Sequence, residues 1–142
     1  MKGRHILLVV LLLVAVCLVS CGIFESIRTQ EYSYYLDTNN YIESEGTVNN
    51  IIYNKDLNTI FLWLSDIDEE YQDTTFAIKG DSVNVAIENG ILDEVEEYSK
   101  ITFISAPKYF GDGYIMPIVS LYIDDVCLLD FDTGYNNLIN MY

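Results

Sequence analysis

Two cysteines four positions apart, Cys17 and Cys21, are the residues whose type and spacing most directly suggest chemistry. They enclose the segment "CLVSC" at the end of the most hydrophobic stretch of the chain. Cysteines at this spacing can form a disulfide, clip a metal ion or act as a redox pair. A cysteine at the end of an apolar stretch is also typical of a processing signal, so the N-terminal context decides between these uses.

Other residues that commonly carry catalysis are scarce. The one histidine, His5, lies near the N-terminus, ahead of the apolar stretch. Histidine is the usual general base and the commonest metal ligand. Cys127 lies within the apolar stretch Val126–Leu129, where a thiol packs rather than reacts. We therefore expect Cys127 to be a small buried hydrophobe and the protein not to be an enzyme.

Acidic residues at alternate positions indicate a weak candidate calcium site. Asp66 and Asp68 form one such pair, and Asp130 and Asp132 form another. Carboxylate oxygens in loops suit Ca²⁺, but neither segment completes an EF-hand loop. The first lacks the glycine at position six of the motif, and the second lacks its terminal glutamate. Ca²⁺ is the one cofactor that the sequence suggests, and two solvated turns are the alternative.

The N-terminal segment has the pattern of an export signal. Lys2 and Arg4 precede residues 6–19, an apolar run without a charge, and polar residues follow Cys21. A run of 14 residues is short for a membrane-spanning helix, which needs about 20 residues. The same length suits the hydrophobic region of a signal peptide.

The end of this signal, Leu18-Val19-Ser20-Cys21, resembles the lipobox of bacterial lipoproteins. In that family the cysteine thiol receives a diacylglyceryl group, whose fatty acids include palmitate, and the preceding peptide bond is cut. The resemblance implies that Leu18, Val19 and Ser20 are recognition positions and that Cys21 is the lipidated residue. Cys17 would then be discarded with the signal, which removes the disulfide, metal and redox readings. The alternative is an uncleaved N-terminal membrane anchor.

The remaining chain is strongly acidic. Removal of residues 1–20 leaves five basic residues against 22 acidic ones, a net charge of −17. Nucleic acid is excluded as a partner because phosphate binding requires clustered Lys and Arg. The expected location is the extracytoplasmic face of the cell membrane, with the lipid on Cys21 as anchor, or the outer membrane if the cell has one. A composition rich in Asn, Ile and Tyr and poor in Arg favours a Gram-positive source.

Hydrophobic periodicity predicts the elements of one domain over residues 43–142. A period near two predicts strands at 47–53, 60–64, 75–78, 101–104, 118–123 and 126–131. Helical spacing predicts a helix over 81–97, interrupted at Gly90, and a terminal helical turn over 135–142, capped by Asp132 or Thr133. Residues 21–42 show no sustained period and are expected to form the lipidated N-terminus and a tether.

Three strands, a helix and two or three further strands follow one another in about a hundred residues. This order resembles the OB-fold, a small five-stranded Greek-key barrel with a helix between its third and fourth strands. The segment "GYIMPIVSLYIDDVCLLDF" is similar to the C-terminal hairpins of small uncharacterised Gram-positive lipoproteins. The fold prediction is therefore mainly β and OB-like, with a two-layer α+β sandwich as the alternative.

Aromatic residues mark a candidate ligand-binding surface. Tyr109, Phe110 and Tyr114 lie in the loop 106–114, which also contains two glycines and a proline. In an OB-fold this loop joins strands four and five beside the ligand face, and Trp63 on the second strand would share that face. A peptide, a glycan strand or a protein of the cell envelope would bind there. The alternative is that the rings cap the barrel.

These patterns lead to one preferred function and two alternatives. The preferred function is a membrane-anchored extracytoplasmic lipoprotein whose domain binds a ligand or protein without catalysis. The first alternative is an immunity or inhibitor lipoprotein that captures a basic exported toxin or hydrolase, since its negative charge would speed that encounter. The second is a structural module of the cell envelope that Ca²⁺ stabilises.

Overall fold

Every segment with a period near two forms a β-strand in the computed structural model, which describes residues 2–110 and 114–142 and only the backbone of residues 2–5. Within these residues the strands are β1 (Ile42–Asn54), β2 (Thr59–Ser65), β3 (Thr75–Lys79), β4 (Lys100–Ser105), β5 (Ile115–Ile123) and β6 (Val126–Leu129). The helices are α1 (Lys2–Leu36), α2 (Asp81–Glu88), α3 (Ile91–Glu94) and α4 (Phe131–Ile139), with short 3-10 helices η1 (Thr38–Asn40) and η2 (Glu69–Tyr71). The break predicted at Gly90 separates α2 from α3.

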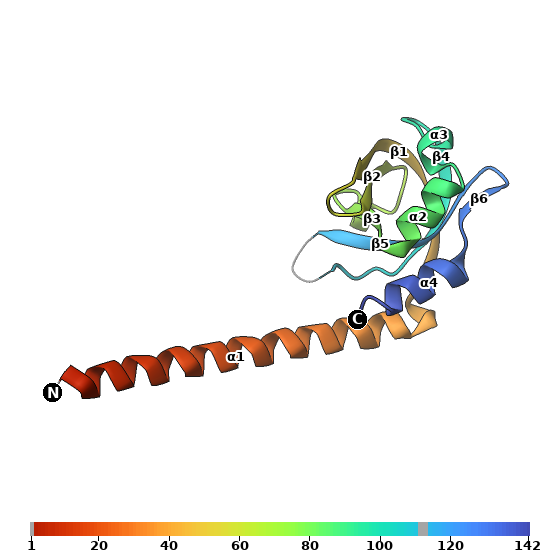
Figure 1. Cartoon of the computed structure of the whole chain (residues 1–142). Helices are drawn as coiled ribbons and strands as arrows, with labels where there is room; N and C mark the ends of the chain where they lie inside the picture. The colour runs from red at the N-terminus through yellow and green to blue at the C-terminus, as the bar shows by residue number, and fades with distance from the viewer. Residues whose placement is uncertain (1, 111–113) are drawn as a thin grey trace.

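The strands close into the predicted OB-like barrel (Figure 1). Strand β1 pairs antiparallel with β2 and β4, β2 pairs with β3, and β4 pairs with β5. A parallel pairing of β3 with β5 closes the five-stranded ring, and β6 extends the sheet beyond β5. The helix α2 lies between the third and fourth strands in sequence, as predicted. Closure of the sheet excludes the two-layer sandwich.

The long strand β1 bends so that it can belong to two pairings. Residues 42–47 pair with β4 and residues 47–54 pair with β2, with an irregularity between Val48 and Asn50. Gly46 sits at the bend, where Ile67 covers it, and a Cβ there would lie 2.8 Å from the Ile67 Cγ2 atom. Bulges and glycines are the usual means by which a barrel strand turns a corner.

Alternate residues of the strands fill the barrel. Ile60, Leu62 and Leu64 of β2 are at most 3% exposed, while Phe61 and Trp63 between them are half-buried on the outer side. The rings of Phe76 and Phe103 meet edge to face inside, with centroids 5.1 Å apart. Burial of each such side chain contributes about 1.5–3 kcal/mol. The helix α2 closes one end of this core with Val83 and Ala86.

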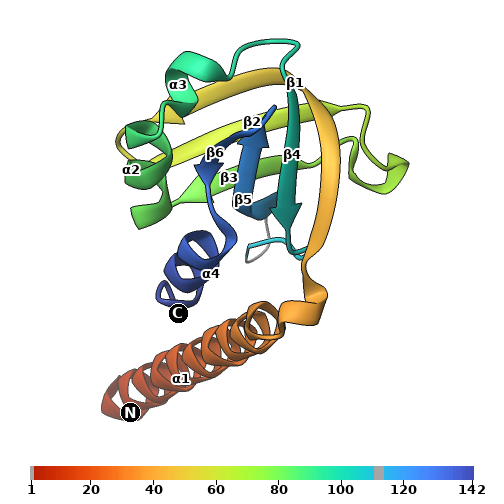
Figure 2. The same ribbon diagram turned by 90° about the vertical axis from the view of Figure 1, so that its right-hand side faces the viewer.

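A second apolar cluster lies outside the barrel, where the C-terminal end of α1 meets α4 and β5 (Figure 2). Its buried members are Tyr35, Ala106, Val119 and Leu138. Gly134 allows α4 to approach β5 closely, because a Cβ at this position would lie 2.8 Å from the Cα atom of Val119. The cluster therefore joins the N-terminal helix to the barrel.

The expected tether over residues 21–42 is mostly helical. The helix α1 runs without a break to Leu36, and the side chains of Glu31 and Tyr35 are buried against the barrel. Packing of the domain thus begins before residue 43. The sequence did not show this because the docked side of α1 is made of polar and aromatic residues, which produce no apolar stripe.

Two further expectations change at the C-terminal end of the chain. Cys127 was expected to be buried but is exposed, since the edge strand β6 leaves Val126 and Cys127 uncovered and only Leu128 and Leu129 are buried. The terminal helix starts earlier than predicted, and its N-cap is Asp130 rather than Asp132 or Thr133.

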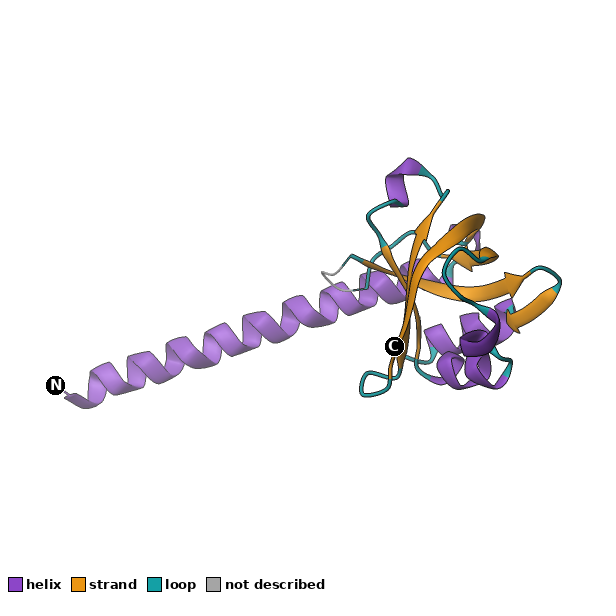
Figure 3. Cartoon of the chain, turned by 90° about the horizontal axis from the view of Figure 1, so that it is seen from above, coloured by secondary structure: helices purple, strands orange, loops and turns teal. Residues whose placement is uncertain are grey.

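The apolar part of α1 projects away from the barrel (Figure 3). Its side chains from Ile6 to Val19 include large hydrophobic ones that are 50–69% exposed, and the helix from Ile6 to Leu36 is long and apolar enough to cross a membrane. By length and composition, such a helix near an N-terminus is compatible with an export signal or a membrane anchor.

We predict that Tyr35→Ala lowers the free energy of unfolding by about 3 kcal/mol, because the side chain is fully buried and truncation of a buried aromatic leaves a cavity. Urea unfolding of the full chain in detergent, followed by Trp63 fluorescence, measures the change. Leu36→Ala is the matched control, since Leu36 is 47% exposed and should change stability by less than about 0.5 kcal/mol. Equal stability of the two variants would show that α1 does not unfold with the barrel.

Candidate functional site

The strand register decides which side chains reach the outer surface of β1, β2 and β3. Residues directly opposite each other on paired strands point to the same side of the sheet. Leu62 and Phe76 form one such pair and are buried in the barrel. The next pair, Trp63 and Thr75, therefore points outward.

Four outward side chains make a continuous strip, which we call the aromatic face: Ile52 of β1, Phe61 and Trp63 of β2, and Thr75 of β3. The Phe61 and Trp63 rings lie side by side with centroids 6.2 Å apart. Ile52 pairs with Phe61 and is 46% exposed. The sequence pointed to Trp63 alone, although the same period of two that buries Leu62 also turns Phe61 and Ile52 outward.

Two of the predicted loop aromatics lie next to this face. The Tyr109 and Tyr114 rings meet edge to face at 5.5 Å, and the hydroxyls of Tyr109 and Thr74 are 3.2 Å apart. The Thr75 amide donates a hydrogen bond to the Tyr114 carbonyl at 3.0 Å, which fixes this end of the loop beside β3. Tyr114 is 74% exposed, whereas Tyr109 packs against the core. Residues 111–113 of the predicted loop lie outside the described residues.

Phe110, by contrast, packs in the second apolar cluster between α1, α4 and β5. Its ring lies 5.8 Å from that of Tyr35 of α1, and the Lys79 Nζ atom sits 4.2 Å above it. Desolvation lowers the pKa of Lys79, and the nearby Glu31 carboxylate opposes that change. Phe110 therefore links the loop to α1 by packing, and this contact does not place it on the aromatic face.

The acidic residues proposed as calcium ligands lie in separate turns. Asp68 caps η2 by accepting a hydrogen bond from the Glu70 amide at 3.2 Å, and Asp66 accepts one from the Thr47 hydroxyl at 2.7 Å. Asp130 caps α4, and Asp132 is exposed in its first turn. Among the described residues, acidic, histidine and cysteine side chains form no group of three suited to a metal ion.

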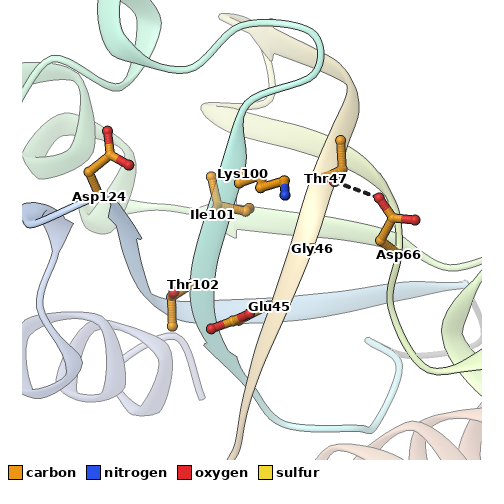
Figure 4. Close-up of a pocket in the computed structure, with 8 residues that line it drawn as sticks. All are labelled: Glu45, Gly46, Thr47, Asp66, Lys100, Ile101, Thr102 and Asp124. Carbon is orange, nitrogen blue, oxygen red and sulfur yellow. Dashed lines mark hydrogen bonds between the residues drawn. The ribbon is translucent and has the colours of Figure 1, made fainter.

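A polar pocket of about 390 Å³ opens on the outer side of β1 and β4 (Figure 4). Lys100 and Thr47 face each other across the two strands, and Asp66 approaches from the loop after β2. Asp124 lies at the opposite end from Asp66, so their carboxylates do not converge (Figure 4). The pocket mixes charges of both signs and is open to solvent.

Polar contacts that the sequence did not reveal fasten α1 to the domain. The Arg28 guanidinium donates to the main-chain oxygen of Tyr142 at 2.6 Å, and the Tyr142 hydroxyl donates to the Glu31 carboxylate at 3.0 Å. The Tyr35 hydroxyl donates to the Lys108 carbonyl at 2.8 Å. Burial, reinforced by the hydrogen bond to Glu31, raises the pKa of Tyr142, so this hydroxyl stays a donor at any physiological pH.

Comparison of the chain with protein-family models, with curated proteins and with solved structures found no match.

We predict that Asp130→Ala destabilises the domain by about 1 kcal/mol through loss of the α4 cap, whereas Asp130→Asn retains most of the stability. Hydrogen bonds from the Thr133 side chain and amide hold the pKa of Asp130 below its ordinary value of 3.8. The carboxylate cap therefore contributes fully above that value and is lost as the pH falls through the lowered pKa, below about pH 4. Urea unfolding from pH 3 to pH 7 measures both effects.

The same variants separate capping from calcium binding. If the role of Asp130 is the cap alone, added Ca²⁺ leaves the melting temperature of the wild type and of Asp130→Asn unchanged. If Ca²⁺ instead raises the melting temperature of the wild type but not that of Asp130→Asn, the Asp130 carboxylate is a metal ligand.

Proposed function

We propose that this chain is a membrane-anchored extracytoplasmic lipoprotein, lipidated at Cys21, whose OB-like domain binds a ligand or protein without catalysis. The aromatic face is the observation that supports binding. Phe61 and Trp63 point away from a core that is already filled by their neighbours, so packing of the barrel does not explain them. Half-buried aromatic side chains beside an exposed aliphatic one on the outer face of a sheet are characteristic of an interaction surface.

The N-terminal helix supports the anchoring part of the proposal. Cys21 lies at the end of the exposed apolar stretch, and its side chain is exposed, as acylation of the thiol requires. One acyl chain holds a protein only marginally at a membrane, whereas two or more hold it durably. The folded domain starts only a few helical turns after this residue.

We predict that Cys21→Ala abolishes lipid attachment. Mass spectrometry of the protein from bacterial membranes should show a diacylglyceryl-modified chain that begins at residue 21 for the wild type. The variant should retain its signal and carry no acyl group. Cys127→Ala is the matched control, because Cys127 is also exposed but lies in the domain. An unmodified full-length wild-type chain would show that α1 is an uncleaved anchor.

We predict that Trp63→Ala weakens ligand binding roughly 30-fold, since removal of a central aromatic from an interface costs about 2 kcal/mol or more. Co-sedimentation with purified cell-wall glycan and capture from envelope extracts, followed by mass spectrometry, provide the readouts. Val126→Ala on the exposed edge strand should leave binding unchanged. Undiminished retention by Trp63→Ala would remove the aromatic face as the binding site.

The strong negative charge supports a second candidate function, an immunity or inhibitor lipoprotein that captures a basic exported toxin or hydrolase. The full chain carries a formal charge of −15, and opposite charges accelerate protein association at low salt. The capture experiment separates the two functions. Capture of a single basic protein would favour the inhibitor if rising salt releases that protein and the Trp63→Ala variant still binds it.

A further inference from the structure

The contacts between α1 and the domain fix the direction in which the barrel faces. The hydroxyls of Tyr35 and Tyr142 bridge α1 and the domain, and Tyr135 donates to the Leu36 carbonyl at 2.9 Å. The Tyr35 ring is fully buried and lies 5.7 Å from that of Tyr142. A side chain held by both burial and a hydrogen bond has little freedom, so the last turns of α1 and the barrel form one rigid unit.

The aromatic face is on the side of the barrel from which α1 arrives. In Figure 1 the strands β2 and β3 lie toward the N-terminal end of α1, and β6 lies away from it. Figure 2 is turned so that the right-hand side of Figure 1 faces the viewer, and it shows β4, β5 and β6 in front of β2 and β3. Outward side chains of β2 therefore face back along the helix, toward its apolar part.

The membrane begins close to this face. The apolar run of α1 continues past Cys21 with Ile23, Phe24 and Ile27, which are 55%, 76% and 44% exposed. From Arg28 to Leu36 a helix rises only about 12 Å. If α1 spans the bilayer up to Ile27, this distance separates the bilayer interface from the docked end of the helix. From a lipidated Cys21 to Leu36 the helix rises about 22 Å.

The exposed apolar residues of α1 lie on the same side as the barrel. Phe24 and Ile27 precede Glu31 and Tyr35 at spacings of three and four residues, which place all four on one side of a helix. Glu31 and Tyr35 are buried against the domain. Phe24 and Ile27 therefore point into the space between the membrane end of α1 and the overhanging barrel.

We propose that the aromatic face docks on the lipid surface, with Ile52, Phe61, Trp63 and the exposed Leu57 of the β1–β2 turn in the interfacial layer of the bilayer. This inference rests on the membrane anchoring of the proposed function. Tryptophan and other amphipathic aromatic residues prefer that layer. Any ligand of this face is then a molecule held at the membrane surface. The acidic charge of the chain makes the docking weaker on anionic than on zwitterionic lipid.

Trp63 is the only tryptophan of the chain, so it reports on this contact without a label. The protein is purified from membranes in detergent and reconstituted into phosphatidylcholine vesicles that are plain or brominated near the glycerol end of the acyl chains. We expect a blue shift of Trp63 emission relative to detergent and a loss of emission in the brominated vesicles. Brominated vesicles of anionic phosphatidylglycerol should quench Trp63 emission less than phosphatidylcholine vesicles do. Added salt should screen the repulsion and raise the quenching to the level seen with phosphatidylcholine.

Two variants form the matched pair for this experiment. Ile52→Glu places a charge on the aromatic face and should reduce the quenching, while Val126→Glu, at the nearly equal exposure of 47% against 46%, lies on β6 and should leave it unchanged. Far-ultraviolet circular dichroism confirms that both variants fold.

The outcomes distinguish docking from anchoring. Vesicle flotation reports anchoring alone: protein that floats with the vesicles but shows equal Trp63 emission in plain and brominated lipid overturns the docking proposal and leaves the anchor intact. Protein that does not float contradicts the anchored function itself. Equal loss of quenching in Ile52→Glu and Val126→Glu would also contradict docking through the aromatic face.

Discussion

Strands β3 and β5 pair in parallel through Thr75, Phe76 and Ala77, and the rest of the structure depends on this short pairing. It joins the two ends of a sheet that would otherwise remain open with both faces exposed. Once the sheet closes, each strand has an inside and an outside, and Leu62 and Phe76 acquire a core to fill. The same closure leaves Trp63 and Phe61 on the outer surface, where they are available for binding.

Three tyrosines hold the N-terminal helix against the barrel. Through Tyr35, Tyr135 and Tyr142 the N-terminal helix is bonded to the barrel, so the segment expected to be a flexible tether is a rigid support. Tyrosine suits this role because its ring fills apolar space while its hydroxyl satisfies a buried carbonyl or carboxylate. With the proposed membrane anchor, a domain held in this way would present a defined side to the bilayer rather than tumble on a linker.

The polar and acidic features of the domain have mainly structural uses. Asp68 and Asp130 satisfy the exposed amides at helix starts, which explains their position without an ion. Of the remaining acidic residues that the structure describes, all but Glu31 lie on the surface, where their charge favours basic partners over anionic ones. The proposed function therefore relies on anchoring at Cys21 and on contacts made by apolar side chains rather than on the acidic residues.

The sequence by itself determined the strands, the break at Gly90, the place of α2 between β3 and β4, and thereby the OB-like fold. Periodicity and turn residues are local signals, and here they agree with the global structure. The outward position of Phe61 and Ile52 beside Trp63 also follows from the period of two. Only the tertiary structure decided that Phe110 packs against α1, that Cys127 is exposed, and that Glu31 and Tyr35 belong to the domain. These outcomes depend on contacts between residues far apart in the chain, most of them polar or aromatic, and such contacts leave no periodic pattern in a sequence.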